Sequence, residues 1–322
     1  MTYARIAGTG SYLPVKVVTN HDLERTLDTT DAWIRERTGI HRRHIAAEDE
    51  TCSDMGVEAA HRAVEMAGID IADIDLIIVG TTTPDKVFPS TACIIQRRLG
   101  IHGCAAFDVQ AACSGFVYAM DIADRFIKTG AARVALIIGS ETLSRITNWQ
   151  DRATAVLFGD GAGAVVLTAG QDPGVLATHI HADGQYEDLL EVPQGISQGF
   201  DTVRANEAYI QMNGNAVFRR AVATLDSMAR ETLTGHDIEQ SDIDWLIPHQ
   251  ANLRIIQAAA KKLDLPMERV VVTVDEHANT SSASIPLALD VAVRDGRIQR
   301  GQMLLFEAFG AGFTWGSALL RY

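Results

Sequence analysis

Residues 105–130 read AAFDVQAACSGFVYAMDIADRFIKTG, and this stretch decides the fold. Its first five residues form a short, mostly apolar run, which is typical of a buried strand. From Cys113 onward, apolar residues recur at helical spacing until Gly130, a residue type that commonly ends a helix. The sequence therefore predicts a strand that turns directly into a helix, with Cys113 at the turn.

The surroundings of Cys113 suit a reactive thiol. Small residues flank it at Ala111, Ala112, Ser114 and Gly115, which leaves room for another molecule to approach. A helix N-terminus offers unpaired N–H groups and a positive dipole end, which favour a thiolate and an oxyanion. A buried, inert core thiol is the alternative interpretation, because free cysteine is among the most buried residue types. We therefore treat Cys113 as a candidate nucleophile.

Composition limits the function classes that fit the chain. Its 322 residues, 47% hydrophobic and 21% charged, are typical of a globular enzyme with two domains or one large one. The net charge of −13 argues against nucleic acid as a partner, because phosphate binding requires a basic face. An acidic partner would have to dock on a local basic patch.

The cysteines and the N-terminus predict a compartment. The four cysteines show neither metal-ligand spacing nor the density of a secreted disulfide scaffold, so we expect reduced thiols and no metal site. The N-terminus resembles no signal peptide, and no apolar run reaches the roughly 18 residues of a membrane span. We expect a cytoplasmic protein without a membrane segment.

A long internal repeat organises the chain. ADIDLIIVGTTT at residues 72–83 is echoed by SDIDWLIPHQAN at residues 241–252, an offset of 169 residues. The same offset aligns Gln110 with Asn279. Strand–helix alternation at so long a period predicts a duplicated α/β unit with helices on both faces of its sheets. We place the two halves at residues 1–171 and 172–322, the first carrying Cys113.

The second half contributes two polar candidates. His249 follows the predicted strand 245–248, and Asn279 follows a predicted strand at 270–274. Because active sites in such folds collect at strand ends, we expect both to face Cys113. A Cys nucleophile with His and Asn donors suits thioester chemistry, in which negative charge develops on a carbonyl oxygen. Separately, His249 could be structural, and Asn279 could cap a helix at 282–293.

Two glycine-rich stretches are less specific. Residues 310–316, GAGFTWG, predict a tight turn whose backbone approaches Cys113, although a plain hairpin turn explains them equally well. FGDGAGA at 158–164 is followed by a strand rather than a helix, so it does not meet the dinucleotide-binding pattern.

Seven motifs together resemble the family of β-ketoacyl-acyl-carrier-protein synthases III. They span the chain in order: GTGSYLP (8–14), DAWIRERTGI (31–40), DVQAACSGF (108–116), FGDGAGA (158–164), LIPHQANLRII (246–256), HANTSSASIP (277–286) and EAFGAGFTWGSAL (307–319). The resemblance implies a thiolase-like, five-layered αβαβα fold and a homodimer. It also implies the initiating condensing enzyme of bacterial fatty-acid synthesis.

The resemblance assigns roles to the three candidates. Cys113 would take acetyl from acetyl-CoA, and His249 and Asn279 would stabilise the enolate formed when malonyl-acyl carrier protein loses carbon dioxide. Attack on the acetyl group would give acetoacetyl-acyl carrier protein. Phe309 matches the aromatic residue that is thought to help expel carbon dioxide, and the N–H of Ala311 matches an oxyanion-hole donor. No cofactor is implied, because CoA thioesters are the substrates.

Further residues match binding positions of the family. Trp33 and Arg152 would sandwich the adenine of CoA, and Phe88 would cross the dimer to close the acyl pocket. The CoA–pantetheine channel would be lined by Thr29, Arg37, Met212, Gly214, Phe218, Asn252 and Arg254. The carrier protein would dock on Arg219, Arg220, Arg254, Lys261 and Lys262, a set that is otherwise an ordinary solvated helix face.

Two positions depart from the family pattern. Ala311 replaces the middle glycine of a turn often written with three, so we expect a φ angle there that alanine can adopt. Asn213 stands where the family often has a small residue beside the channel.

Other enzymes of this fold, and two other classes of protein, share some of these residue types. A thiolase needs a second cysteine near the C-terminus, and none follows Cys113; an elongating synthase has a second histidine in place of Asn279. Polyketide or long-chain condensing enzymes of the same fold stay open, with a longer primer. A Cys–His thioester hydrolase and a catalytically inactive binding module explain fewer of the motifs.

Overall fold

Two stacked β-sheets carry the fold. The structure is a computed structural model that describes residues 2–205, 208–234 and 238–322. In the first sheet the strand order is β1-β7-β6-β4-β5 and in the second it is β11-β12-β13-β8. The first sheet consists of β1 (Tyr3–Tyr12), β4 (Leu76–Gly80), β5 (Ala105–Val109), β6 (Val134–Thr142) and β7 (Asp160–Gly170). The second consists of β8 (Val175–Ala182), β11 (Trp245–Pro248), β12 (Met303–Gly310) and β13 (Thr314–Arg321).

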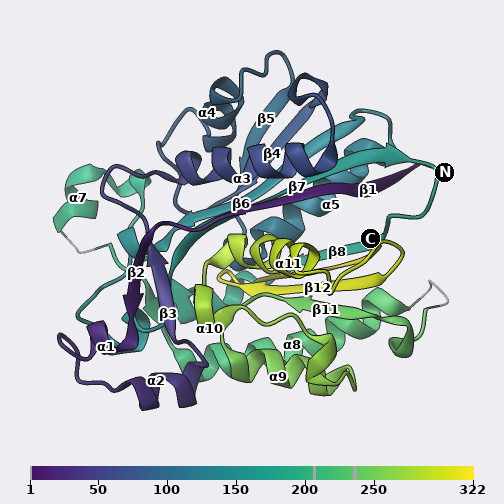
Figure 1. The fold of residues 1–322 in the computed structure, drawn as a ribbon. Helices are drawn as coiled ribbons and strands as arrows, with labels where there is room; N and C mark the ends of the chain where they lie inside the picture. Colours follow the sequence, from purple (N-terminus) through teal and green to yellow (C-terminus); the bar gives the residue numbers. More distant parts are fainter. Residues whose placement is uncertain (1, 206–207, 235–237) are drawn as a thin grey trace.

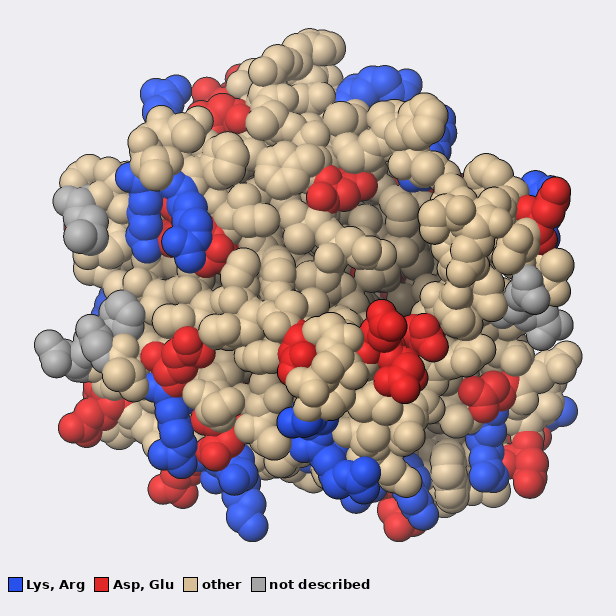
Figure 2. Space-filling view, turned by 180° about the vertical axis from the view of Figure 1, so that it is seen from behind, with Lys and Arg blue, Asp and Glu red and all other residues tan. Residues whose placement is uncertain are grey.

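Helices cover both sheets in three layers. Above the first sheet lie α3 (Cys52–Ala67) and α4 (Thr91–Arg98), and between the sheets lie α5 (Gly115–Lys128) and α11 (Ser284–Arg294) (Figure 1). Below the second sheet lie α8 (Gly214–Leu233) and α9 (Leu253–Lys262). This arrangement confirms the predicted five-layered αβαβα architecture. From behind, basic side chains line the lower edge, where Figure 1 places α8 and α9, interleaved with acidic ones (Figure 2).

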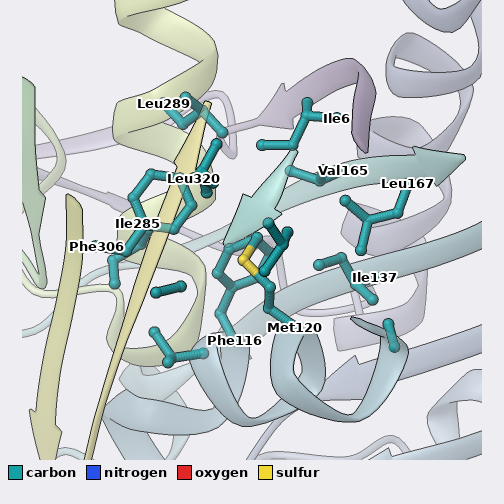
Figure 3. Close-up of a cluster of buried hydrophobic side chains, with 14 of the residues drawn as sticks. Ile6, Phe116, Met120, Ile137, Val165, Leu167, Ile285, Leu289, Phe306 and Leu320 are labelled. Atoms are coloured by element: carbon teal, nitrogen blue, oxygen red, sulfur yellow. The ribbon is translucent and has the colours of Figure 1, made fainter. Parts of the chain in front are cut away.

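The central helix layer is apolar because it faces a sheet on each side. Phe116 and Met120 on α5 are fully buried between the two sheets (Figure 3). Each such side chain contributes roughly 1.5–3 kcal/mol by leaving water. Both sheets and the central helices α5 and α11 contribute side chains to the apolar cluster around them. Its members include Ile6, Ile137, Val165, Leu167, Ile285, Leu289, Phe306 and Leu320.

Strand register confirms the internal duplication. Leu76 of β4 pairs with Ala135 of β6, and Trp245 of β11 pairs with Leu304 of β12, so both partners repeat at the offset of 169 residues. Strand directions agree as well. In the first sheet the pairs β1–β7 and β7–β6 are antiparallel and β6–β4 is parallel, and in the second sheet β8–β13 and β13–β12 are antiparallel and β12–β11 is parallel. The strands of the first sheet end at Gly170 and those of the second begin at Val175. The division into domains at residue 171 stays a prediction.

One predicted strand is wrong. Residues 270–274 form only an isolated bridge between Val270 and Leu246, and the chain then enters the short helix α10 (Val274–His277). The cause is the buried amide of Gln250. Its Oε1 accepts from the backbone N–H groups of Thr273 and Val274, at 2.8 and 3.2 Å, and its Nε2 donates to Val271 O at 3.1 Å. A side chain thus takes the bonds that a fifth strand would make.

One helix start also differs from the prediction. The helix after Cys113 begins at Gly115, because a 3₁₀ turn, η2 (Ala112–Ser114), precedes it. Helix α8 begins at Gly214, where the Oδ1 of Asn213 accepts from Ala216 N at 3.2 Å. Asn213 is therefore an N-cap, which accounts for a polar residue at this position.

The remaining α-helices and strands are short, as are the 3₁₀ turns η4 and η8. They are β2 (Lys16–Thr19), α1 (Asn20–Leu23), α2 (Asp31–Thr38), β3 (Arg42–Ile45), α6 (Arg152–Ala155), η4 (Gly184–Leu189), β9 (Leu190–Glu191), α7 (Phe200–Ala205), β10 (Gln211–Met212) and η8 (Ser281–Ala283). Within the described ranges, no helix is both long enough and apolar enough to cross a membrane.

Candidate active site

Cys113 lies on a sharp turn between β5 and α5. The turn requires a left-handed residue, Ala112 at φ 45°, and its equivalent in the second half, Ser281, has φ 51°. The backbone of Gly310 at the end of β12 presses against this turn, since a Cβ atom at Gly310 would lie 2.7 Å from Cys113 N. Position 310 therefore accepts only glycine, and the second half fixes where the Cys113 side chain can lie.

His249 and Asn279 are each held by the backbone and by a hydroxyl or amide neighbour. The N–H of His249 donates to Glu307 O at 2.7 Å, and its Nδ1 lies 2.7 Å from Ser284 Oγ. The Oδ1 of Asn279 accepts from Ser281 N at 2.9 Å, which leaves its Nδ2 as a donor. Cys113, His249 and Asn279 line one cavity of about 280 Å³, the first cavity. The structure thus brings the three predicted residues together.

Burial governs the protonation of Cys113 and His249. It raises the pKa of the Cys113 thiol to about 12, with Glu141 adding to the rise and a hydrogen bond with Ser281 opposing it. Cys113 is 9% exposed and helix α5 starts two residues later, so burial opposes the thiolate that a helix N-terminus favours. Burial also lowers the pKa of His249 to about 3, so its imidazole is neutral.

Cys113 also lines a second cavity, of about 970 Å³. Its walls come from the stretch after β4, from the β6–β7 connection and from the turn at Ala311. Apolar walls include Val87, Leu143, Ile146, Phe158 and Ile210. The left-handed non-glycine residues among those described are Ala112, Asp264, Ala278 and Ser281, so Ala311 has an ordinary φ, as expected.

Most residues matched to CoA binding line the first cavity. They are Trp33, Arg37, Met212, Gly214, Phe218, Asn252 and Arg254. Arg152 lies at its rim, with its Cζ 4.9 Å from the centroid of the Trp33 ring. Thr29 is not among the lining residues, although its hydroxyl is buried without a hydrogen-bond partner.

The two predicted contact surfaces are both exposed. Phe88 is 83% exposed and lies outside both cavities, and its neighbour Val87 is 58% exposed. Arg219 and Arg220 project from α8, and Arg254, Lys261 and Lys262 from α9, all of them exposed. Lys262 forms an ion pair with Asp226 at 3.6 Å, so its charge is partly neutralised.

Two side-chain clusters have metal-ligand chemistry. One consists of His179, His181 and Glu231, and the other of His41, Asp275 and Glu276. None of these residues lines either cavity. Glu231 lies 2.9 Å from His181 Nε2 and Glu276 lies 3.1 Å from Arg42 Nε, so each of these carboxylates already has a partner in the protein.

Two site residues were missed by sequence reasoning. Ser284 contacts His249 from α11, and Glu307 lines the first cavity with neither carboxyl oxygen hydrogen-bonded. Burial raises the pKa of Glu307 to about 8, so it is mostly protonated at neutral pH. Glu307 stands within a quoted motif, and its place in a buried strand was the available signal.

A duplicated five-layered fold with Cys, His and Asn at one cavity defines the thiolase-like condensing enzymes. Sequence profiles described as 3-Oxoacyl-[acyl-carrier-protein (ACP)] synthase III and its C-terminal part match residues 107–184 and 233–322. The chain belongs to the 3-oxoacyl-[acyl-carrier-protein] synthase III family.

Individual relatives cover the whole chain. The chain is 67% identical to the beta-ketoacyl-[acyl-carrier-protein] synthase III of Thioalkalivibrio sulfidiphilus and 63% identical to that of Alkalilimnicola ehrlichii, each over 100% of both proteins. The crystal structure of 3-oxoacyl-[acyl-carrier-protein] synthase III from Aquifex aeolicus superposes with a TM-score of 0.93 at 48% identity. That match covers 99% of this chain and 100% of the other.

Proposed function

We propose that this chain initiates fatty-acid synthesis by condensing an acetyl or other short acyl primer from CoA with malonyl-acyl carrier protein. The products are acetoacetyl-acyl carrier protein, CoA and carbon dioxide. The observation that carries the proposal is the position of Cys113 where two cavities meet, with His249 and Asn279 on the wall of one. A thioester can enter by the first cavity while its acyl chain occupies the second.

In the first step, the Cys113 sulfur attacks the thioester carbonyl. The bond from the acyl carbon to the CoA sulfur breaks, and the thiol proton ends on CoA. The Cys113 thiol must lose its proton for this attack, because burial raises its pKa to about 12, and the positive end of helix α5 favours the thiolate that forms. Backbone N–H groups at Cys113 and Ala311 are the proposed donors to the oxyanion.

In the second step, malonyl-acyl carrier protein loses carbon dioxide and leaves an enolate. His249 and Asn279 stabilise its oxygen with the donors that their other hydrogen bonds leave free. The enolate carbon attacks the acyl carbonyl, and the Cys113 sulfur leaves and recovers a proton. Phe309, 7% exposed on the first cavity, supplies an apolar wall that favours release of carbon dioxide over retention of a carboxylate.

Primer length is the open part of the function. The second cavity is large and apolar enough for a chain longer than acetyl. A condensing enzyme with a longer primer is therefore the second candidate, and it uses the same residues.

CoA itself is proposed to lie in the first cavity, with its adenine held by Trp33 and Arg152. The planar guanidinium already faces the indole, which supports a stacking role. Thr29 lies outside the cavity lining, so its assignment rests on the family pattern alone. The chemistry requires no cofactor besides these thioester substrates.

A homodimer is the proposed assembly. Strand β5 is an edge of the first sheet, and its backbone is available for pairing with a second copy. The exposed Phe88 would then leave water by entering the partner's second cavity.

The carrier protein is proposed to dock on the exposed basic residues of α8 and α9, named above, beside the first cavity. Since the chain has a net charge of −13, this local patch is what an acidic partner would recognise. The four cysteines are free thiols, which supports action in the reducing cytoplasm.

Intact-protein mass spectrometry tests the proposal. Acetyl-CoA should add one acetyl group at Cys113, and malonyl-acyl carrier protein should then remove it with formation of acetoacetyl-acyl carrier protein. An adduct only from longer acyl-CoAs would change the primer and keep the chemistry. Removal of the adduct as free acid, without a condensation product, would favour a thioester hydrolase.

A further inference from the structure

A row of four side chains runs from the exposed face of α8 to the wall of the first cavity. The Cζ of Arg220 lies 4.0 Å from the centroid of the Tyr186 ring. Tyr186 stacks on Phe313 with centroids 5.7 Å apart and planes at 25°, and Phe313 meets Phe309 at 4.7 Å and 51°. Both separations are within the range of favourable aromatic pairs.

Backbone bonds hold this row in place. Phe313 is 1% exposed, and its N–H and C=O exchange hydrogen bonds with Asp183, both at 2.8 Å. On the other side, Asn213 N donates to Leu189 O at 2.9 Å, so the segment carrying Tyr186 is tied to the start of α8. Tyr186 therefore stands between the proposed docking helix and the turn that follows Phe309.

The two ends of the row have different chemistry. Arg220 is exposed, and an acidic partner can draw its guanidinium into a charge-assisted bond that is stronger than its contact with an aromatic ring. Phe309 and Phe313 are buried, so their packing responds to the loss of a neighbouring ring. Arg219, the residue before Arg220 on α8, makes no ion pair or ring contact within the described residues.

We propose that Tyr186 is a positioning residue for condensation. It presents Arg220 to the acidic carrier protein and supports Phe313 against Phe309 at the first cavity. Docking of the carrier protein and the packing around Phe309 thereby both depend on the ring of Tyr186. This inference rests on the proposed function and adds a residue to it.

The test replaces Tyr186 by Leu, which keeps apolar bulk, and by Phe, which keeps the ring. Condensation is measured with malonyl-acyl carrier protein and with malonyl-CoA, which has no carrier to dock. Acetylation of Cys113 by acetyl-CoA serves as the control reaction. Tyr186→Leu should raise the KM for malonyl-acyl carrier protein about fivefold and lower kcat about threefold with either malonyl thioester. Acetylation should stay within twofold, and Tyr186→Phe should restore both constants.

Arg219→Ala and Arg220→Ala form a matched pair. Each should raise the KM for malonyl-acyl carrier protein in the wild type. In the Tyr186→Leu background, Arg219→Ala should keep its full effect, whereas Arg220→Ala should lose most of its own, because coupled residues are not additive. Should the Leu variant not fold, Tyr186→Met, which also lacks the ring, takes its place in this comparison, whereas Arg220→Ala should keep its full effect in Tyr186→Phe.

Three outcomes would overturn the inference. One is unchanged condensation by Tyr186→Leu; another is a loss of Cys113 acetylation as large as the loss of condensation, which indicates a general structural defect. The third is full additivity of Arg220→Ala with Tyr186→Leu, the variant that lacks the ring. In all three, wild-type turnover leaves the proposed function intact. Wild-type protein that makes no condensation product would instead refute the proposed function, and the inference with it.

Discussion

The Nδ1 atom of His249 lies 2.7 Å from Ser284 Oγ, and the same oxygen accepts from Gln250 N at 3.2 Å. Because the hydroxyl oxygen receives the backbone proton, its own proton is free to point at Nδ1. That arrangement favours the tautomer with the proton on Nε2, where it can serve a developing enolate. Ser284 reaches His249 from α11, an element that contributes no side chain to the first cavity.

Ser284→Ala should therefore lower the rate of condensation about tenfold, since general acid–base groups lose efficiency when misoriented. Acetylation of Cys113 should change less, and Ser284→Thr, which keeps a hydroxyl, should recover part of the loss. Steady-state kinetics with malonyl-acyl carrier protein beside time-resolved acetylation separates the two steps. Equal losses in both steps would contradict an effect on the enolate donor.

Cys113→Ala should abolish the acyl adduct, because no other thiol reaches both cavities: Cys52 is buried elsewhere, and Cys93 and Cys104 lie outside the cavity walls. The measurement is intact mass after incubation with acetyl-CoA, with Cys52→Ala as the matched control. Wild-type acylation by Cys113→Ala would refute the nucleophile assignment.

His249→Ala and Asn279→Ala should spare acylation of Cys113 and stop condensation, with losses of at least about a hundredfold. Each removes one donor from the enolate oxygen while Cys113 stays in place. Radiolabelled carbon dioxide release from malonyl-acyl carrier protein reports decarboxylation directly. A variant that decarboxylates normally yet fails to acylate would reverse this division of labour.

Glu307 should make the fold less stable as the pH rises. Its pKa is raised to about 8 in the folded state from an ordinary value near 4.5, so between these values the unfolded chain releases a proton that the folded chain retains. Stability is therefore highest below about pH 4.5 with respect to this group, and falls until about pH 8. Glu307→Gln should remove that loss, roughly a few kcal/mol at its full extent. Urea unfolding of both proteins at pH 5.5 and 8.5 measures it, and an equal difference at both pH values would contradict the assignment.

The sequence predicts the architecture better than the site's interior. The repeat at 169 residues could be recognised in the sequence because equivalent buried strands have similar apolar residues. The strand pairings of β4 and β11 show the same offset. The failure at residues 270–274 has one cause, the Gln250 amide, which no periodicity reports. Contacts such as Tyr186 with Arg220 join residues 34 positions apart through side chains alone, and the protonation of Cys113 depends on burial by both halves. Neither this side-chain contact nor the protonation of Cys113 can be predicted from composition and spacing.

CoA binding should move Arg152 away from Trp33. Its Cζ already lies 4.9 Å from the indole centroid, a direct cation–π contact that leaves no layer for an adenine ring between them. Adenine must therefore displace the guanidinium before it can be held between the two, and the environment of the indole must change. Titration with CoA should alter tryptophan emission in the wild type, and this change should largely vanish in Trp33→Phe, which leaves three of the four tryptophans. Arg152→Ala should weaken CoA binding about fivefold while the emission change persists. An identical emission change in Trp33→Phe would mean that the adenine binds elsewhere.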